Sequence, residues 1–151
     1  MTTRTTWSEL KTYRWRQVKI YQWGYTLQLP DREQALYRFW AGFGIPAYEE
    51  NSVPADAAYP YITYSVSVGD RVSLTANIFY RSSSLLEINS KTAEIESTLG
   101  RSGITARYNN GALWIQKGSP FYVTVPAEES DIKHKLLNIE AEFIERGKNN
   151  D

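Results

Sequence analysis

The sequence predicts a single α+β domain in which a mainly antiparallel β-sheet packs with two helices. Two segments place apolar residues at helical spacing between capping signals, and several others alternate apolar and polar residues as strands do. The 151 residues, 42% hydrophobic and 23% charged, suit one globular core. We expect three divisions: a basic aromatic extension over 1–30, the folded domain over 31–146, and a polar tail over 147–151.

The composition excludes several kinds of site. The chain has no cysteine, which removes disulfides, thiolate nucleophiles and Cys-rich metal sites. Seventeen basic residues balance seventeen acidic ones, which argues against a dedicated nucleic-acid or membrane-surface protein. No apolar run approaches the roughly 20 residues that span a bilayer. The N-terminus also lacks the apolar stretch of a secretory signal. We therefore expect a cytoplasmic location, or an assembly built in the cytoplasm.

The first thirty residues mix basic and aromatic side chains, with Glu9 as their one acid. Such a mixture can bind nucleic acid through phosphate contacts and base stacking. It also suits an arm that packs on its own domain or on a neighbouring subunit. We favour the arm because the spacing matches no known nucleic-acid motif. The alternation from Tyr21 to Leu29 predicts a strand.

The first helix is predicted from Asp31, whose side chain and that of Gln34 form a capping box. One apolar face follows at helical spacing, made of Leu36, Phe39, Trp40 and Phe43. Gly42 and Gly44 end the helix and Pro46 prevents its continuation.

Residues 45–60 contain three prolines and no periodicity, which predicts an extended loop. A loop this long inside a compact domain is uncommon unless it has a function. We therefore expect it to contact other subunits, through candidate interface residues Tyr48, Glu49, Glu50, Val53, Asp56 and Tyr59.

A β-hairpin is predicted next, with strands over 62–68 and 72–80 joined by a turn at Gly69-Asp70. A second capping box, Ser84 with Glu87, then opens a helix that Gly100 ends. The apolar stripe of this helix consists of Leu85, Ile88, Ile95 and Leu99.

The pattern returns to strands after residue 103. Asn109-Asn110-Gly111 predicts a tight turn, and Gly118-Ser119-Pro120 predicts another before a strand over 121–125. The segment 131–146 fits a helix and a strand equally well on its periodicity.

No set of residues in the sequence has the pattern that catalysis requires. The single histidine, His134, cannot anchor a typical zinc site without a second histidine or a cysteine. A Ser-His-Asp arrangement could combine His134 with Asp131 and the serines at 82–84, but no nucleophile-elbow motif supports it.

Two further patterns have simpler interpretations than a ligand site. Gly42-Phe43-Gly44 lacks the third glycine of a nucleotide loop and follows a helix. The pairs Glu49-Glu50 and Glu128-Glu129 are interpreted as solvated charge more readily than as acid–base catalysts or ligands of a cation between subunits. We therefore expect a protein that is not an enzyme, with no catalytic residue, cofactor or metal ion. The aromatic content of 14% instead suggests contacts with other proteins.

Three stretches carry a family resemblance: Leu36 to Pro54 (LYRFWAGFGIPAYEENSVP), Pro60 to Tyr64 (PYITY) and Asn110 to Phe121 (NGALWIQKGSPF). Together with the closing NIEAEF (138–143), they resemble the tail terminator, or tail completion, proteins of long-tailed bacteriophages and prophages. The similarity covers roughly residues 31–146, whereas residues 1–30 have no counterpart in that pattern.

The resemblance implies a sheet packed against helices and a long last strand, which favours a strand over 131–146. It also implies an oligomeric ring, commonly a hexamer, at the head-proximal end of the tail tube in the virion neck. Such a ring stops tube polymerisation, offers a joining surface to the head connector and lets DNA pass through it. The alternatives are another head–tail neck or completion protein, a nucleic-acid-binding module using the N-terminal arm, and a small hydrolase built on His134.

Overall fold

The computed structural model describes residues 29–67 and 69–145, which form one six-stranded sheet and two α-helices. The elements follow one another as α1 (Arg32–Ala41), β1 (Ala47–Glu49), the 3₁₀ turn η3 (Glu50–Ser52), β2 (Tyr61–Tyr64), β3 (Arg71–Arg81), α2 (Leu86–Leu99), β4 (Ile104–Tyr108), β5 (Gly111–Val125) and β6 (Ile132–Glu145). The strand order is β1-β2-β3-β6-β5-β4. Only β1 and β2 are parallel. The predicted α+β class is therefore confirmed.

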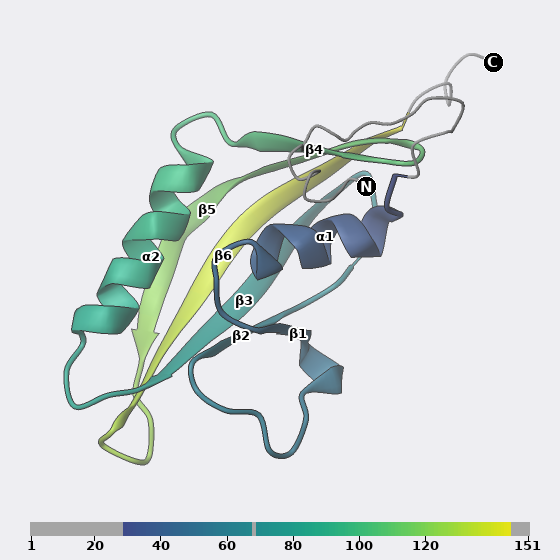
Figure 1. Cartoon of the computed structure of the whole chain (residues 1–151). Coiled ribbons are helices and arrows are strands. Elements are labelled where there is room, and N and C mark those ends of the chain that lie inside the picture. The colour runs from purple at the N-terminus through teal and green to yellow at the C-terminus, as the bar shows by residue number, and fades with distance from the viewer. Residues whose placement is uncertain (1–28, 68, 146–151) are drawn as a thin grey trace, which may run out of the picture.

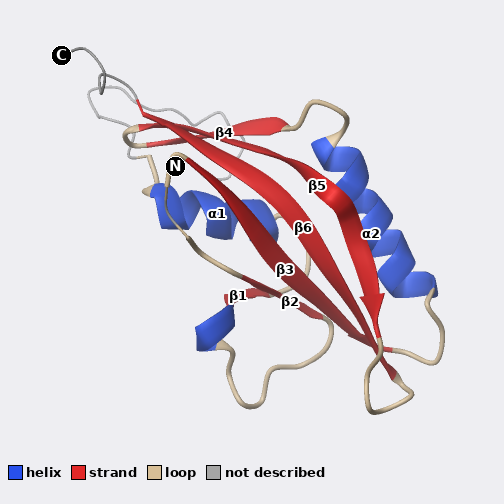
Figure 2. Cartoon of the chain, turned by 180° about the vertical axis from the view of Figure 1, so that it is seen from behind, coloured by secondary structure: helices blue, strands red, loops and turns tan. Residues whose placement is uncertain are grey.

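Both helices cover the same face of the sheet (Figure 1), while the view from behind shows β3, β6 and β5 without a helix over them (Figure 2). The residue pattern explains this arrangement. Alternate residues of β3 and β6, such as Leu74, Ile78, Leu137 and Ile139, are almost fully buried, and the residues between them are partly exposed. A strand with this alternation needs a cover on one face only.

Helix α1 begins as predicted. The backbone N–H of Gln34 donates to Asp31 Oδ1 at 2.8 Å, and the Asp31 N–H donates to Gln34 Oε1 at 3.2 Å, which completes the capping box. Leu36 and Trp40 bury their side chains against the sheet, and Gly42 caps the helix end. None of the helices in the described ranges is long and apolar enough to cross a membrane.

Helix α2 lacks the predicted capping box. Its N-cap is Leu85, which makes no side-chain cap bond, because the helix starts one residue later than the Ser84–Glu87 pattern requires. Ser84 Oγ instead accepts from the Leu86 N–H at 3.3 Å. Leu85 is 44% exposed and does not join the buried stripe, where Thr92 lies between Ile88 and Ile95.

The segment 45–60 is more regular than predicted. It contains β1, which pairs with β2 in register from Ala47↔Ile62 to Glu49↔Tyr64, and the turn η3. Ala47 is buried and joins the core. A three-residue strand is too short to give a periodicity that can be recognised in the sequence.

The predicted hairpin forms between β2 and β3, although β2 ends at Tyr64 and not near residue 68. Ser65 continues the pairing with its side chain, since its Oγ accepts from the Thr75 N–H at 3.0 Å. The hairpin strands therefore end at Tyr64 and begin again at Arg71, so they lie farther apart in the sequence than a turn at Gly69-Asp70 predicts. Val68 lies outside the described residues, as does nearly all of the strand predicted from Tyr21 to Leu29.

The predicted turn at Gly118-Ser119-Pro120 is wrong, because β5 continues from Gly111 to Val125. The pairing with β6 shifts register between Lys117↔Ile139 and Tyr122↔Leu137, so the residues between form a bulge opposite Asn138. Asn138 Nδ2 donates to the Pro120 carbonyl at 3.0 Å and ties the bulge to β6. The Asn109-Asn110 turn and the C-terminal strand, in contrast, are confirmed.

Candidate interface surface

The six residues predicted to form a subunit interface lie together at the β1 edge of the sheet. Tyr48 and Glu49 are in β1, Glu50 is in η3, and the other three, Val53, Asp56 and Tyr59, belong to the connection to β2. Figure 1 shows this connection extending away from the body of the sheet. Glu49, Glu50 and Asp56 are exposed, and within the described residues none of them forms an ion pair.

A ladder of rings crosses the helix-free face from this edge. The ring centroids are separated by 5.9 Å for Tyr48–Tyr61, 5.1 Å for Tyr61–Phe79 and 4.4 Å for Phe79–His134. The register explains the contacts, because Tyr61 pairs with Phe79 and Phe79 pairs with His134 on adjacent strands. Each ring is half-buried, so the ladder offers a continuous, partly apolar surface.

Tyr59 extends the ladder and joins it to a charged cluster. Its ring lies 5.3 Å from that of Tyr61, and the Arg81 guanidinium lies 4.9 Å from the Tyr59 ring centroid. Arg81 also binds Asp131 at 2.6 Å and Glu129 at 3.6 Å. Burial, followed by the neighbouring Tyr59, raises the pKa of the Tyr61 phenol, which favours its neutral form.

The arrangement does not bring together the hydrolase residues considered from the sequence. His134 Nε2 is paired with Asn77 Oδ1 at 2.7 Å while its ring stacks on Phe79. The Asp131 carboxylate is engaged by Arg81. Burial lowers the pKa of His134, which favours the neutral ring.

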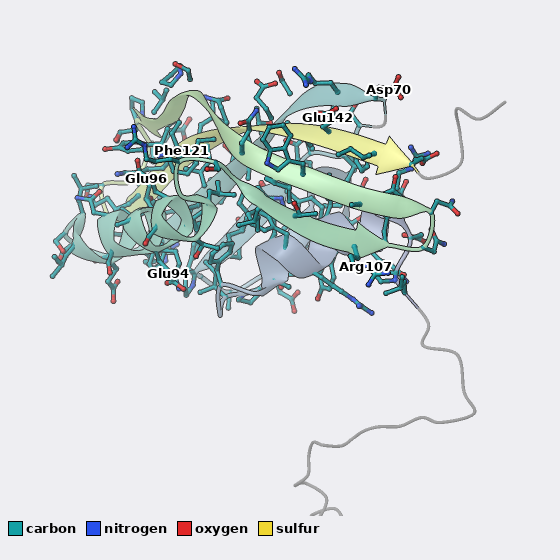
Figure 3. All side chains as sticks on the ribbon, turned by 90° about the horizontal axis from the view of Figure 1, so that it is seen from above. Asp70, Glu94, Glu96, Arg107, Phe121 and Glu142 are labelled. Atoms are coloured by element: carbon teal, nitrogen blue, oxygen red, sulfur yellow. The ribbon has the colours of Figure 1, made fainter. Side chains whose placement is uncertain are left out.

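The carboxylate pairs of the sequence are not gathered into a metal site. In the described ranges, no cluster of three or more His, Cys, Asp and Glu side chains is placed to hold a metal ion. Glu129 contacts Arg81 instead. Farther along the helix-free face, Glu142 pairs with Arg71 at 2.9 Å, and Figure 3 shows Glu142 on the side of the sheet away from the helices.

A second exposed edge lies at the other end of the strand order, on β5, and was not predicted from the sequence. Strand β4 covers only Gly111–Ile115 of β5, so the outer side of residues 116–125 has no strand partner within the described part of the chain. Tyr122 and Val123 on this edge are 43% and 44% exposed. Periodicity could not reveal the edge, since it depends on how far β4 extends along β5.

Lys135 lies beside this β5 edge and is only 4% exposed. Its Nζ is 4.1 Å from the centroid of the Tyr122 ring, and no described residue forms an ion pair or hydrogen bond with it. Burial lowers the pKa of Lys135, and no acidic side chain of the described ranges opposes that effect. The burial of Lys135 could have been predicted from the sequence, because Lys135 shares the alternation of Leu137, Ile139 and Ala141 once 132–145 is assigned as a strand.

Comparison with known proteins shows a likeness in fold. No family model matches the chain, and no curated protein sequence does either. The fold is similar to that of a chain in the virion of a native gene transfer agent particle, with a TM-score of 0.52 and 14% sequence identity. The similarity covers 75% of this chain and 94% of that chain. At this identity the likeness shows a shared fold.

Proposed function

We propose that this protein is a structural subunit of a phage-like particle. It forms an oligomeric ring that caps the head-proximal end of the tail tube and offers a surface to the head connector. The observation that carries the proposal is the shared fold with a chain from a gene transfer agent virion, which includes nearly the whole of that chain. The sequence resemblance to tail terminators supports the same kind of particle and is the reason for proposing this position within it.

The surface of the subunit supports an assembly role. A ring of identical subunits needs a heterologous contact, in which two different surfaces of each copy meet. The described sheet has exposed edges of different chemistry, among them β1 with its acidic connection and residues 116–125 of β5. The half-buried ladder of aromatic side chains beside β1 provides the kind of surface that is favoured at protein contacts.

The proposal is tested by the solution mass of the purified protein. Light scattering across a concentration series should give multiples of the 17.4 kDa subunit, and electron micrographs should show closed rings, free or on the ends of added tail tubes. Unfolding curves taken on the same samples report whether the subunit is folded. A folded protein that stays monomeric at every concentration and ignores tube protein contradicts the proposal.

Another neck protein is the nearest alternative, because fold alone does not fix the position of a subunit within a particle. A binding experiment separates the two. A terminator binds the ends of tubes that lack heads, whereas a head-completion protein binds filled heads that lack tails. We expect this protein on tube ends, and decoration of heads alone would favour the alternative.

A further inference from the structure

The unpaired ammonium of Lys135 is the feature that the fold leaves unexplained. A buried charge without a partner destabilises the folded chain, and buried lysines are normally paired. Lys135 is 4% exposed, and among the described residues its ammonium has no ion pair or side-chain hydrogen bond and interacts with the face of Tyr122. The core would accept an apolar side chain here, since Leu137 and Ile139 occupy the next positions of the same face.

The location of Lys135 suggests where a partner would enter. It pairs across β6 and β5 with Thr124, next to the part of β5 that β4 leaves uncovered. Tyr122 and Thr124 are both exposed at this edge. A strand that came alongside residues 122–125 would place its side chains next to Tyr122, within reach of the ammonium beneath the ring.

The other edge of the sheet carries the complementary charge. Glu49 and Glu50 are exposed on β1 and η3, and neither is paired within the described part of the chain. β1 is parallel to β2, β2 is antiparallel to β3, and β3 and β5 are both antiparallel to β6. β1 and β5 therefore run in opposite directions, so head-to-tail copies would bring β1 beside β5 in an antiparallel arrangement.

We infer that the β1 edge of one copy docks on the uncovered β5 edge of the next copy, and that the Glu49–Glu50 pair supplies the carboxylate that binds Lys135. This inference rests on the proposed ring and specifies its contact. The occupant of the β5 edge is a second copy of this chain, because the matching acidic edge lies on the opposite side of the same sheet. The Lys135 site is complete only when that copy is present.

The test replaces Lys135 with methionine, which keeps the length of the side chain and removes its charge. Lys135→Met should leave the isolated subunit as stable as the parent or more stable, because an unpaired buried charge is lost. Assembly should weaken about tenfold or more, because the docked carboxylates lose their partner. Lys133→Met is the matched control. Lys133 is also on β6, but it lies beyond the part of β6 that pairs with β5, and its Nζ donates to the Ser130 carbonyl of its own chain at 2.6 Å. Assembly of this variant should change by less than about twofold.

The acidic side has its own variant and control. Glu49→Gln with Glu50→Gln should weaken assembly as Lys135→Met does. The variant that carries all three changes should assemble no more weakly than the weaker of those two variants. Asp70→Asn removes an exposed acid from the connection between β2 and β3, outside both docking edges, and should assemble normally.

A cross-link then checks the geometry, because the chain contains no natural cysteine. A double variant, Asn51→Cys with Thr124→Cys, keeps both acids and should give a ladder of multimers with a short bismaleimide. A mixture of the two single variants should stop at dimers, and either single variant alone should remain uncross-linked. This inference is overturned if rings form equally well in the unmodified protein and in Lys135→Met and no cross-linked ladder appears. That outcome would still support the proposed ring. A parent that never assembles, with or without tube protein, overturns both.

Discussion

Tyr108 shows how one buried polar atom stabilises the end of the sheet. Its side chain is fully buried at the end of β4, and its hydroxyl donates to Glu145 Oε2 at 3.1 Å, while the Glu145 carboxylate also pairs with Arg32. This links β4, β6 and the start of α1. Burial, followed by the bond to Glu145, raises the pKa of Tyr108 to about 12.

The raised pKa gives a prediction about alkaline stability. The unfolded chain loses the phenolic proton near pH 10, whereas the folded protein keeps it to about 12, so the stabilisation is complete below pH 10 and is lost as the pH rises through about 12. Tyr108→Phe should cost about 1 kcal/mol in the free energy of unfolding at pH 8. The same substitution should also remove part of the decrease in the free energy of unfolding that occurs above pH 10. Urea unfolding at pH 8 and above pH 10 measures both effects, and identical pH profiles for the two proteins would contradict the assignment.

At the scale of the element, the starts of α1 and α2 lead to opposite predictions about the stability of cap variants. Asp31 caps α1 with a complete box, so Asp31→Ala should lower the free energy of unfolding by about 1 kcal/mol. Ser84 resembles a cap in the sequence but does not cap α2, so Ser84→Ala should cost no more than about 0.5 kcal/mol. Thermal unfolding of the two variants under one set of conditions compares them directly. Equal losses would mean that Ser84 acts as a cap after all.

The elements also show what a sequence can predict and why the rest is hidden. Local signals predicted α1 and the Asn109-Asn110 hairpin correctly, because caps and tight turns depend on neighbouring residues. The same logic failed at Gly118-Ser119-Pro120, where the long β6 strand pairs on both sides of the interruption and turns it into a bulge. Periodicity alone also left β6 undecided between helix and strand, because its apolar residues fit both patterns.

The candidate site was predictable in part for the same physical reason. An unusually long proline-rich segment marked the β1 edge, and its residues do lie together there. The interface role of those residues remains a prediction. The ring ladder and the unpaired β5 edge could not be predicted, since both depend on which strands become neighbours and where β4 ends. Such properties arise from long-range pairing and leave no local pattern.

At the scale of the whole molecule, charge is divided unequally along the chain. The described residues carry ten basic and fifteen acidic side chains, a formal net charge of −5, while residues 1–28 carry five basic side chains and one acidic side chain. An acidic domain repels the phosphate backbone of DNA, whereas a basic aromatic segment attracts it. Any affinity for DNA should therefore reside in residues 1–28.

This division predicts the behaviour of a truncated chain. A protein that begins at Leu29 should keep its unfolding temperature within a few degrees, because 31–146 is expected to be the folded domain, and it should show no measurable affinity for single- or double-stranded DNA. Fluorescence anisotropy of labelled DNA, with the full-length protein as the comparison, measures the difference at about 50 and 200 mM salt. Binding by the full chain that weakens steeply with salt and disappears on truncation would assign a nucleic-acid role to the N-terminal segment. Equal binding by both proteins would refute the charge argument, and a large fall in unfolding temperature would refute the domain boundary.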